Sequence, residues 1–520
     1  MELLERKSDP SLSRHSRAHP TNESEQWSSL STSGERTSTV GLIGEYHTLR
    51  TAQAGRDGQP ADTQSSSTAL NTEPSDSGEF KLPDLPSLLV VVLGNALAQV
   101  TFFIIVSSAS AYADHLRGSA TFSGLTIGIP TVFAGLALIP MVRNDQGCYS
   151  KALKASYVSM IIGNILYALA YRANWLYLIL IGRIIAGFGF TSFMYSKRYC
   201  SDPRIVGIRR RTTLASCLVL GQGFGFSAGP FLGGLLFRIG FRNPVFNGYT
   251  SPGWVMAGTW ILFGLASTWL FKEVAKPHRA PERYIPSIQV RTATVVESTD
   301  DSESTSPTQA NFQLEEAEVG DTISSLTLRR WGVIITMMWY AMTCFFVLGA
   351  WESNIPVYSA VAFHYTPYNA GNFIALGGIT AFPFLMLNVW YSRRVQDRTI
   401  LALGASLGCC GILIMLATLY ADRVTFGSFY ICWALVALGF NLASTCTLSL
   451  LSKQLPSNWN GWTSLAIQYS NYTGRVTGAI WGGAGVSVGM KNYLWVQVAI
   501  AGIGVLMHMT LWRELKAKTG

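Results

Sequence analysis

Charged side chains are scarce in this sequence of 520 residues. Asp, Glu, Lys and Arg together make up 13% of it, whereas apolar residues make up 49%. Soluble domains carry about twice that share of charge, so a string of soluble domains is excluded. The apolar residues instead gather in runs of about twenty, the length that a helix needs to cross a hydrocarbon core about 30 Å thick. The sequence therefore predicts an all-α membrane protein.

Several patterns that would indicate an enzyme or a metal protein are also absent. The cysteines include no CxxC pair, which argues against a disulfide scaffold or a zinc site. Neither the GxxxxGK phosphate-binding loop nor the HExxH zinc motif occurs. One GxSxG match at 225–229 lies inside a single apolar run, whereas a nucleophile elbow needs a strand, a turn and a helix. We therefore expect no enzyme, no cofactor and no metal.

Twelve apolar runs form two sets of six, one within 87–272 and the other within 330–513. The residues at 1–86, 273–329 and 514–520 are polar, and we expect a disordered tail, a disordered linker and a short C-terminal tail. No leader pattern opens the chain, so the first spanning helix is expected to direct insertion. Six helices plus six around a long linker predict two pseudo-symmetric bundles, with a substrate site between them midway through the membrane. The runs lie at about 87–112, 121–141, 152–171, 175–195, 211–237, 253–272, 331–351, 367–389, 400–420, 427–451, 462–485 and 492–513.

The distribution of Lys and Arg predicts how the chain crosses the membrane. The short loops on the side of the termini, to which we assign Lys197 and Arg198, carry more basic residues than the opposite loops. Basic loops stay in the cytosol, so we expect both termini and the linker to be cytosolic. The net charge of +9 is then explained by topology, and no nucleic-acid partner is expected.

A glycine-rich motif stands in the fifth run. Gly225, Gly229, Pro230, Gly233 and Gly234 spell GxxxGPxxGG. Glycines four apart share one helix face, where a neighbouring backbone can approach closely in lipid, and the proline favours bending. We expect this helix to make a tight, bendable contact typical of transporters.

Polar residues within the runs are candidates for a substrate site. Arg183 and Arg475 lie near the middle of their runs, where a charge costs about 2.5 to 3.5 kcal/mol, and Gly187 leaves room beside Arg183. Gln468, Asn471 and Arg475 are spaced three and four apart, so they form one polar stripe that should face a water-filled cavity. We expect these residues to bind an anionic substrate. The alternative is that the arginines fix helix packing by pairing with backbone carbonyls.

Glu352 is the one acidic residue within a predicted run and stands near the end of the seventh. A carboxyl group partly removed from water can take up and release a proton in a transport cycle, so we expect Glu352 to couple transport to protons. The alternative is a carboxylate at the outer end of the helix, exposed at the surface.

These residues resemble the major facilitator superfamily over about 87–513. Gly225 through Gly234 match the antiporter motif of its fifth helix, and Arg183, Gly187 and Gly189 resemble the RxxxGxG motif associated with proton coupling in its fourth. The resemblance implies twelve transmembrane helices that work by alternating access. The GxxxDRxGRR loop motif of the family is reduced here to Asp145, Gly147 and Lys151 after the second run, and to Arg393, Arg394 and Arg398 after the eighth.

Three shorter blocks resemble one branch of that superfamily: GNILYALA at 163–170, KRYCSD at 197–202 and YTSPGW at 249–254. The branch contains vacuolar phosphate transporters with an SPX domain and lysosomal facilitators linked to ceroid lipofuscinosis. The tail at 1–86 is too short and too polar for an SPX helical bundle. The serine-rich tail and linker suit a eukaryotic member, such as a fungal one.

The sequence thus predicts a secondary transporter in a lipid bilayer, coupled to protons, which moves a small organic or inorganic anion. A transporter-like sensor or scaffold without turnover is the alternative, and a membrane-embedded enzyme is disfavoured because no catalytic cluster is present. A vacuolar or lysosomal membrane and the plasma membrane are both compatible with the sequence.

Overall fold

The computed structural model describes residues 81–143, 148–202, 204–241, 243–273, 328–391, 394–454 and 460–516. The predicted tails and linker lie outside these residues except at their edges. Within the described residues the helices fall into an N-terminal and a C-terminal set. The N-terminal set comprises α1 (Leu85–Phe103), α2 (Ala109–His115), α3 (Ala120–Arg143), α4 (Tyr149–Ala173), α5 (Leu176–Gly189), α6 (Ser192–Ser201), α7 (Ile208–Ile239) and α8 (Ser251–Leu270). The C-terminal set comprises α9 (Leu328–Phe363), α10 (Pro367–Tyr391), α11 (Asp397–Tyr420), α12 (Phe426–Gln454), α13 (Asn460–Val488) and α14 (Met490–Thr510).

Eleven helical stretches in the described part of the chain are long and apolar enough to cross a membrane. One of them, Leu176–Ser201, combines α5 and α6, so these two helices form one interrupted span. The long helix α13 falls outside the eleven because it carries the polar stripe seen in the sequence. With α13 included, the helices match the twelve predicted runs, and the predicted fold class is confirmed.

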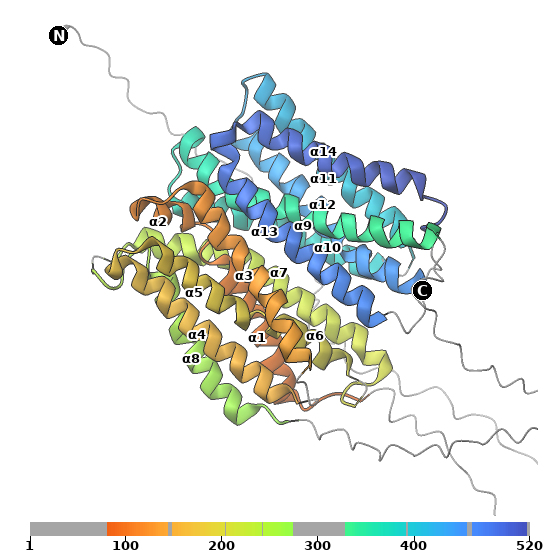
Figure 1. Cartoon of the computed structure of the whole chain (residues 1–520), viewed down its shortest axis with the longest axis horizontal. Helices are drawn as coiled ribbons and strands as arrows, with labels where there is room; N and C mark the ends of the chain where they lie inside the picture. Colours follow the sequence, from red (N-terminus) through yellow and green to blue (C-terminus); the bar gives the residue numbers. More distant parts are fainter. Residues whose placement is uncertain are drawn as a thin grey trace, which may run out of the picture. The chain divides into compact units, whose positions relative to one another are not determined.

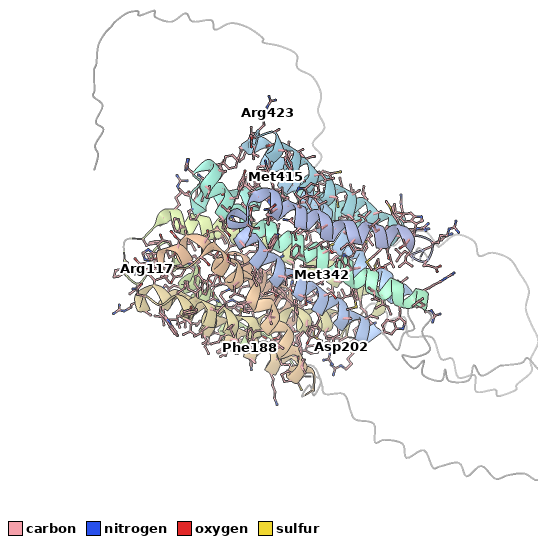
Figure 2. The ribbon with its side chains drawn as sticks, turned by 45° about the horizontal axis from the view of Figure 1, so that its top comes forward. Arg117, Phe188, Asp202, Met342, Met415 and Arg423 are labelled. Atoms are coloured by element: carbon pink, nitrogen blue, oxygen red, sulfur yellow. The ribbon has the colours of Figure 1, made fainter. Side chains whose placement is uncertain are left out.

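The two sets of helices form two bundles that pack against each other (Figure 1). The contact between them runs mainly along α3 with α13 and along α7 with α10. We call the side on which α1 begins and α14 ends the terminal side, and the other the opposite side. Arg117 and Asp202 lie at the two ends of the N-terminal bundle, on the opposite and terminal sides respectively (Figure 2).

The glycine-rich motif of α7 makes the tight contact that its spacing predicts. A Cβ added to Gly229 would lie 2.6 Å from the Cβ of Phe103 on α1, and one added to Gly233 would collide with the carbonyl oxygen of Ile104. Gly234 faces the other bundle, where the carbonyl oxygen of Pro367 would lie 3.0 Å from its Cβ. The motif therefore holds α7 against α1 within its own bundle and against α10 of the other.

Two of the spans in the N-terminal bundle are broken. α1 ends at Phe103, and the short α2 resumes only at Ala109, directly after the residues that Gly233 contacts. The α5 and α6 span is interrupted at Phe190 and Thr191, where the Thr191 hydroxyl lies 3.1 Å from that of Ser156 on α4. Phe102, at the end of α1, and Phe190, at the second interruption, meet edge to face with their ring centroids 5.4 Å apart.

On the terminal side, polar contacts tie the helix ends of the N-terminal bundle together. The Glu273 carboxylate accepts the backbone N–H groups of Tyr149 and Ser150 at 2.9 and 2.7 Å, at the start of α4. Asp202, which follows α6, accepts a bond from the Tyr149 hydroxyl at 2.7 Å and forms an ion pair with Arg204 at 2.6 Å. Burial alone would raise the pKa of the Asp202 carboxyl, but the bonds from Arg204 and Tyr149 outweigh burial and lower that pKa to about 2.

Replacing Gly229 by leucine should destabilise the protein because the new side chain would collide with Phe103. Overpacking of this kind costs about 1 to 3 kcal/mol. Thermal unfolding of the purified protein in detergent should show a lower Tm for Gly229→Leu. Gly258→Leu on α8 is the matched control, since no described atom lies within 4 Å of a Cβ built there. An equal Tm for the two variants would contradict the contact.

Replacing Asp202 by asparagine should destabilise the protein in a pH-dependent manner. An unfolded carboxyl has a pKa of about 3.9, so its lower folded pKa contributes stability that is present above pH 4 and is lost as pH falls towards 2. At pH 7 the loss should be on the order of 2 kcal/mol, and the gap between Asp202→Asn and wild type should narrow on acidification. A gap that stays constant from pH 7 to pH 3 would argue against the charged pair.

Candidate functional site

A cavity of about 150 Å³ lies between the two bundles. Side chains from both bundles line it, which is the position that a duplicated bundle predicts for a substrate site. From the N-terminal bundle the lining residues are Gln99, Phe102, Thr131, Ala134, Phe190, Phe193, Lys197 and Gln222, and from the C-terminal bundle they are Phe345, Gln468, Asn471, Tyr472 and Arg475.

The two bundles close over the cavity on the opposite side. There α3 and α13 approach so closely that a Cβ on Gly124 would collide with the carbonyl oxygen of Ala479. On the other flank, Gly371 of α10 packs in the same way against the carbonyl oxygen of Pro230. Lys197 lies one turn before the end of α6 on the terminal side and is exposed. The bundles therefore pack closely on the opposite side of the cavity, and the lining reaches the exposed Lys197 on the terminal side.

The polar stripe of α13 faces this cavity, as its spacing predicts. Gln468, Asn471 and Arg475 all line the cavity, and so does Tyr472 beside them. The Oδ1 atom of Asn471 is buried and has no hydrogen-bond partner among the described residues. A buried acceptor of this kind is costly, so it is available to a donor on a bound molecule.

Arg475 forms an ion pair with Glu352 of α9. Its Nη2 atom donates to Oε2 of Glu352, and both side chains are buried, with 7% of Arg475 and none of Glu352 exposed. The Oε1 atom of Glu352 has no partner among the described residues. Because α9 continues to Phe363, Glu352 lies well inside a helix of 36 residues. The expectation that Glu352 stands near the end of its span is thus wrong, and so is the alternative of an exposed carboxylate.

Close packing of α13 on α9 brings this pair together. A Cβ on Gly474, Gly478 or Gly482 would collide with the backbone of α9, and one on Gly349 of α9 would lie 2.9 Å from the Arg475 carbonyl oxygen. The three glycines of α13 are four residues apart and share one face. Sequence reasoning missed this ladder, although its GxxxGxxxG spacing resembles that of the motif in α7.

Arg183 is separated from the cavity by Phe102. The whole residue is 1% exposed and is absent from the lining, and its Nε atom donates to the carbonyl oxygen of Thr126 at 3.1 Å. Gly187 lets α5 approach α3 closely, because a Cβ there would lie 2.8 Å from the carbonyl oxygen of Pro130 on α3. The structure therefore does not bring the two arginines to one water-filled surface.

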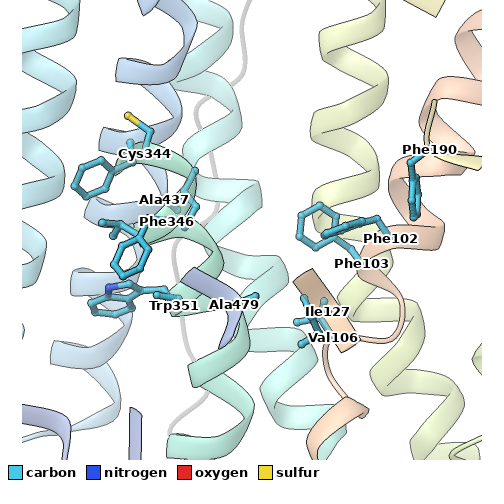
Figure 3. Packing of buried hydrophobic residues seen from close by; sticks show 14 of the residues in the cluster. Phe102, Phe103, Val106, Ile127, Phe190, Cys344, Phe346, Trp351, Ala437 and Ala479 are labelled. Carbon is cyan, nitrogen blue, oxygen red and sulfur yellow. The ribbon is translucent and has the colours of Figure 1, made fainter. Parts of the chain in front are cut away.

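Phe102 contacts both guanidinium groups. Its ring centroid lies 5.8 Å from Cζ of Arg183 and 5.0 Å from Cζ of Arg475, and Phe103 lies 5.1 Å from the latter. Distances under about 6 Å allow an attraction between a cation and the ring face. Figure 3 shows Phe102, Phe103 and Phe190 gathered on the side of the N-terminal bundle, facing Phe346 and Trp351 across the interface.

The charges around the cavity do not balance. Lys197 and Arg475 line it, and Arg183 lies behind Phe102. In the described spanning helices there are two carboxylates: Glu352, and Asp397 at the first residue of α11. Of these, Glu352 is the one beside the cavity. Sequence reasoning assigned Lys197 to a loop, but the structure places it on the cavity wall. Three cations against one carboxylate leave the site with an excess of positive charge.

A helical bundle with a central polar cavity between two six-helix halves defines a membrane transporter. The family model described as Major Facilitator Superfamily matches residues 91–490, and the chain belongs to this superfamily. Members of this family move solutes across membranes and are not enzymes.

Several known proteins are similar to this chain. An MFS-type transporter of Schizosaccharomyces pombe is 31% identical over 447 residues, with 84% of each chain covered. An SPX domain-containing membrane protein of Arabidopsis thaliana is 26% identical and covers 71% of this chain and 55% of its own. Among solved structures, a bacterial homologue of the human lysosomal transporter Spinster has a TM-score of 0.59 at 14% identity, covering 82% of this chain and 96% of that one. The solved structures support the fold alone.

Removing Arg475 alone from the buried ion pair should destabilise the protein more than removing both charges. Arg475→Gln leaves the Glu352 carboxylate unpaired, at a cost of about 3 to 5 kcal/mol, while the double variant Arg475→Gln with Glu352→Gln removes both charges. Thermal unfolding should show a higher Tm for the double variant than for Arg475→Gln. Arg423→Gln, at an exposed loop position, is the control and should not change the Tm. Additive losses in the double variant would show that the pair is not formed.

Proposed function

We propose that this protein is a secondary transporter that works by alternating access, is coupled to protons and moves a small organic or inorganic anion. The observation that carries the proposal is the ion pair of Arg475 with Glu352, buried at the wall of a cavity that has an excess of positive charge. An anionic substrate would offset that excess, and a fixed guanidinium offers two parallel donors to a carboxylate or phosphate group.

The ion pair can couple proton uptake by Glu352 to binding of the substrate by Arg475. While Glu352 is ionised, it occupies Arg475. When Glu352 takes up a proton, its attraction for Arg475 is lost, and the guanidinium can turn its donors to an anion in the cavity. Release of the proton from Glu352 restores the pair and displaces the anion. The substrate and deprotonated Glu352 thus compete for the Arg475 guanidinium. Protonation of Glu352 and binding of the anion are therefore thermodynamically linked.

The packing of the bundles supports alternating access. The tight contacts of Gly124 and Gly371 hold the bundles together on the opposite side, while the lining of the cavity reaches Lys197 on the terminal side. With the termini in the cytosol, as the positive-inside rule predicts, this is the state open to the cytosol. Transport requires that the contacts at Gly124 and Gly371 separate while the terminal side closes. We propose a vacuolar or lysosomal-type endomembrane or the plasma membrane as the location.

Replacing Glu352 by glutamine should abolish transport driven by a proton gradient while leaving exchange intact. Glutamine keeps the shape of the side chain but cannot carry the proton, so Arg475 stays available to the anion. Uptake of labelled phosphate and of labelled organic carboxylates into proteoliposomes would be measured with and without an inward proton gradient, and exchange would be measured against the same unlabelled anion inside.

Asp114→Asn, which removes an exposed carboxylate on α2, is the matched control and should retain proton-driven uptake. Retained proton coupling in Glu352→Gln would remove Glu352 from the mechanism. Binding of an anion by wild-type protein without any flux would instead favour a sensor or scaffold.

A further inference from the structure

We propose that the transported anion is an organic acid with an apolar body about the size of one six-membered ring, and that Lys197 binds its acid group while Arg475 is still paired with Glu352. This inference rests on the proposed function, since it assumes that the cavity binds the transported anion. It names a substrate class and a binding residue in addition to Arg475.

Lys197 is the cation of this site that is free to bind an anion. Arg475 is occupied by Glu352, and Arg183 is enclosed behind Phe102. The Lys197 ammonium has neither an ion pair nor a hydrogen bond among the described residues, and it is exposed in the cavity. An incoming acid group would therefore meet Lys197 without first displacing a carboxylate.

Two aromatic rings precede Lys197 along the chain and form an aromatic wall of the cavity. Phe193 and Lys197 are four residues apart on α6, so they share one face, and Phe190 at the break before α6 lines the cavity beside them. The rings of Phe190 and Phe193 are stacked, with centroids 5.7 Å apart, and Phe102 meets Phe190 edge to face at 5.4 Å. An apolar body lying against these rings would bring an acid group at its end to Lys197.

The rest of the lining fits an amphipathic molecule better than a bare inorganic anion. Phe345 and Tyr472 face the wall from the other bundle, so aromatic rings line the cavity from both sides. A small, strongly hydrated anion could use the polar lining residues, but it would lose water against these rings without an apolar part to pack on them. A cavity of about 150 Å³ suits one benzene-sized ring, as an engineered apolar cavity of that volume in another protein shows.

Gln222 adds a fixed polar group beside the wall. Its Nε2 atom donates to Oδ1 of Asn95 at 3.3 Å, and the Nδ2 atom of the fully buried Asn95 donates to the carbonyl oxygen of Leu218 at 3.1 Å. This chain fixes the orientation of the Gln222 amide on the cavity surface. Its remaining carbonyl oxygen can accept a bond from a polar substituent on the ring.

The test uses the purified full-length protein and three probes at equal ionic strength. Thermal unfolding would be followed with 3-phenylpropionate, which has a ring and a charge, with inorganic phosphate, which has only charge, and with 3-phenylpropionamide, which has only the ring. We expect 3-phenylpropionate to raise the Tm at concentrations about tenfold lower than either other probe, because only it uses both Lys197 and the aromatic wall.

Variants test the residue itself. Lys197→Met should weaken stabilisation by 3-phenylpropionate about tenfold, which is the loss of one charged contact, and should leave the weak effect of 3-phenylpropionamide unchanged. Lys197→Arg should retain binding. Lys154→Met, at an exposed position on α4, is the matched control and should behave as wild type. Phe193→Ala should weaken binding of both ring probes and leave phosphate unaffected.

The outcomes separate this inference from the proposed function. Stabilisation by phosphate and not by 3-phenylpropionate would overturn the organic class while anion transport stands. Undiminished binding of 3-phenylpropionate by Lys197→Met would overturn the role of Lys197. Stabilisation by the neutral amide with no effect of either anion would contradict both proposals. Failure of all three probes would overturn the assigned class.

Discussion

The close approach of α13 to α9 is the constraint on which the site depends. Gly474, Gly478 and Gly482 let the two backbones touch, and only at that separation does Arg475 reach Glu352. A buried ion pair is tolerated in the membrane interior when its geometry is good and both charges are satisfied together. The glycine ladder thus places a carboxylate beside a cavity-lining arginine without exposing it to lipid.

The glycine-rich motif of α7 also affects this site, through its contact with α1. It packs against α1 at Gln99 and Phe103, and Phe102 lies between those two contacts. Phe102 in turn separates the enclosed Arg183 from the cavity and contacts Arg475. A motif that is distant in sequence from both arginines therefore packs beside the ring that contacts both of them. The α7 contact also continues to α10, so the same helix connects α1 to the interface between the bundles.

Periodicity was enough to predict the twelve helices and the polar stripe of α13, because both depend on local spacing along one chain segment. The burial of a side chain depends on the helices packed around it, and the predicted surroundings of Glu352 and Lys197 were wrong for this reason. Glu352 stood at the end of an apolar run, yet Ser353 and Asn354 continue the buried helix because their side chains bond to carbonyl oxygens of α13. Lys197 follows an apolar run in the same way, and only the packing of α6 shows that it faces the cavity. Except at their edges, the predicted tails and linker lie outside the described residues, and their boundaries stay predictions.

The interruption at Phe190 and Thr191 divides the fourth span into two segments with separate attachments. Arg183 belongs to the segment before the break, which is fixed to α3 and α4, and Lys197 belongs to the segment after it. Contacts of α5 with α3 and α4 enclose the arginine, whereas contacts of α6 with α1, α4 and α7 position the lysine. One transmembrane span thus carries two cations in separately anchored halves, one enclosed and one facing the cavity.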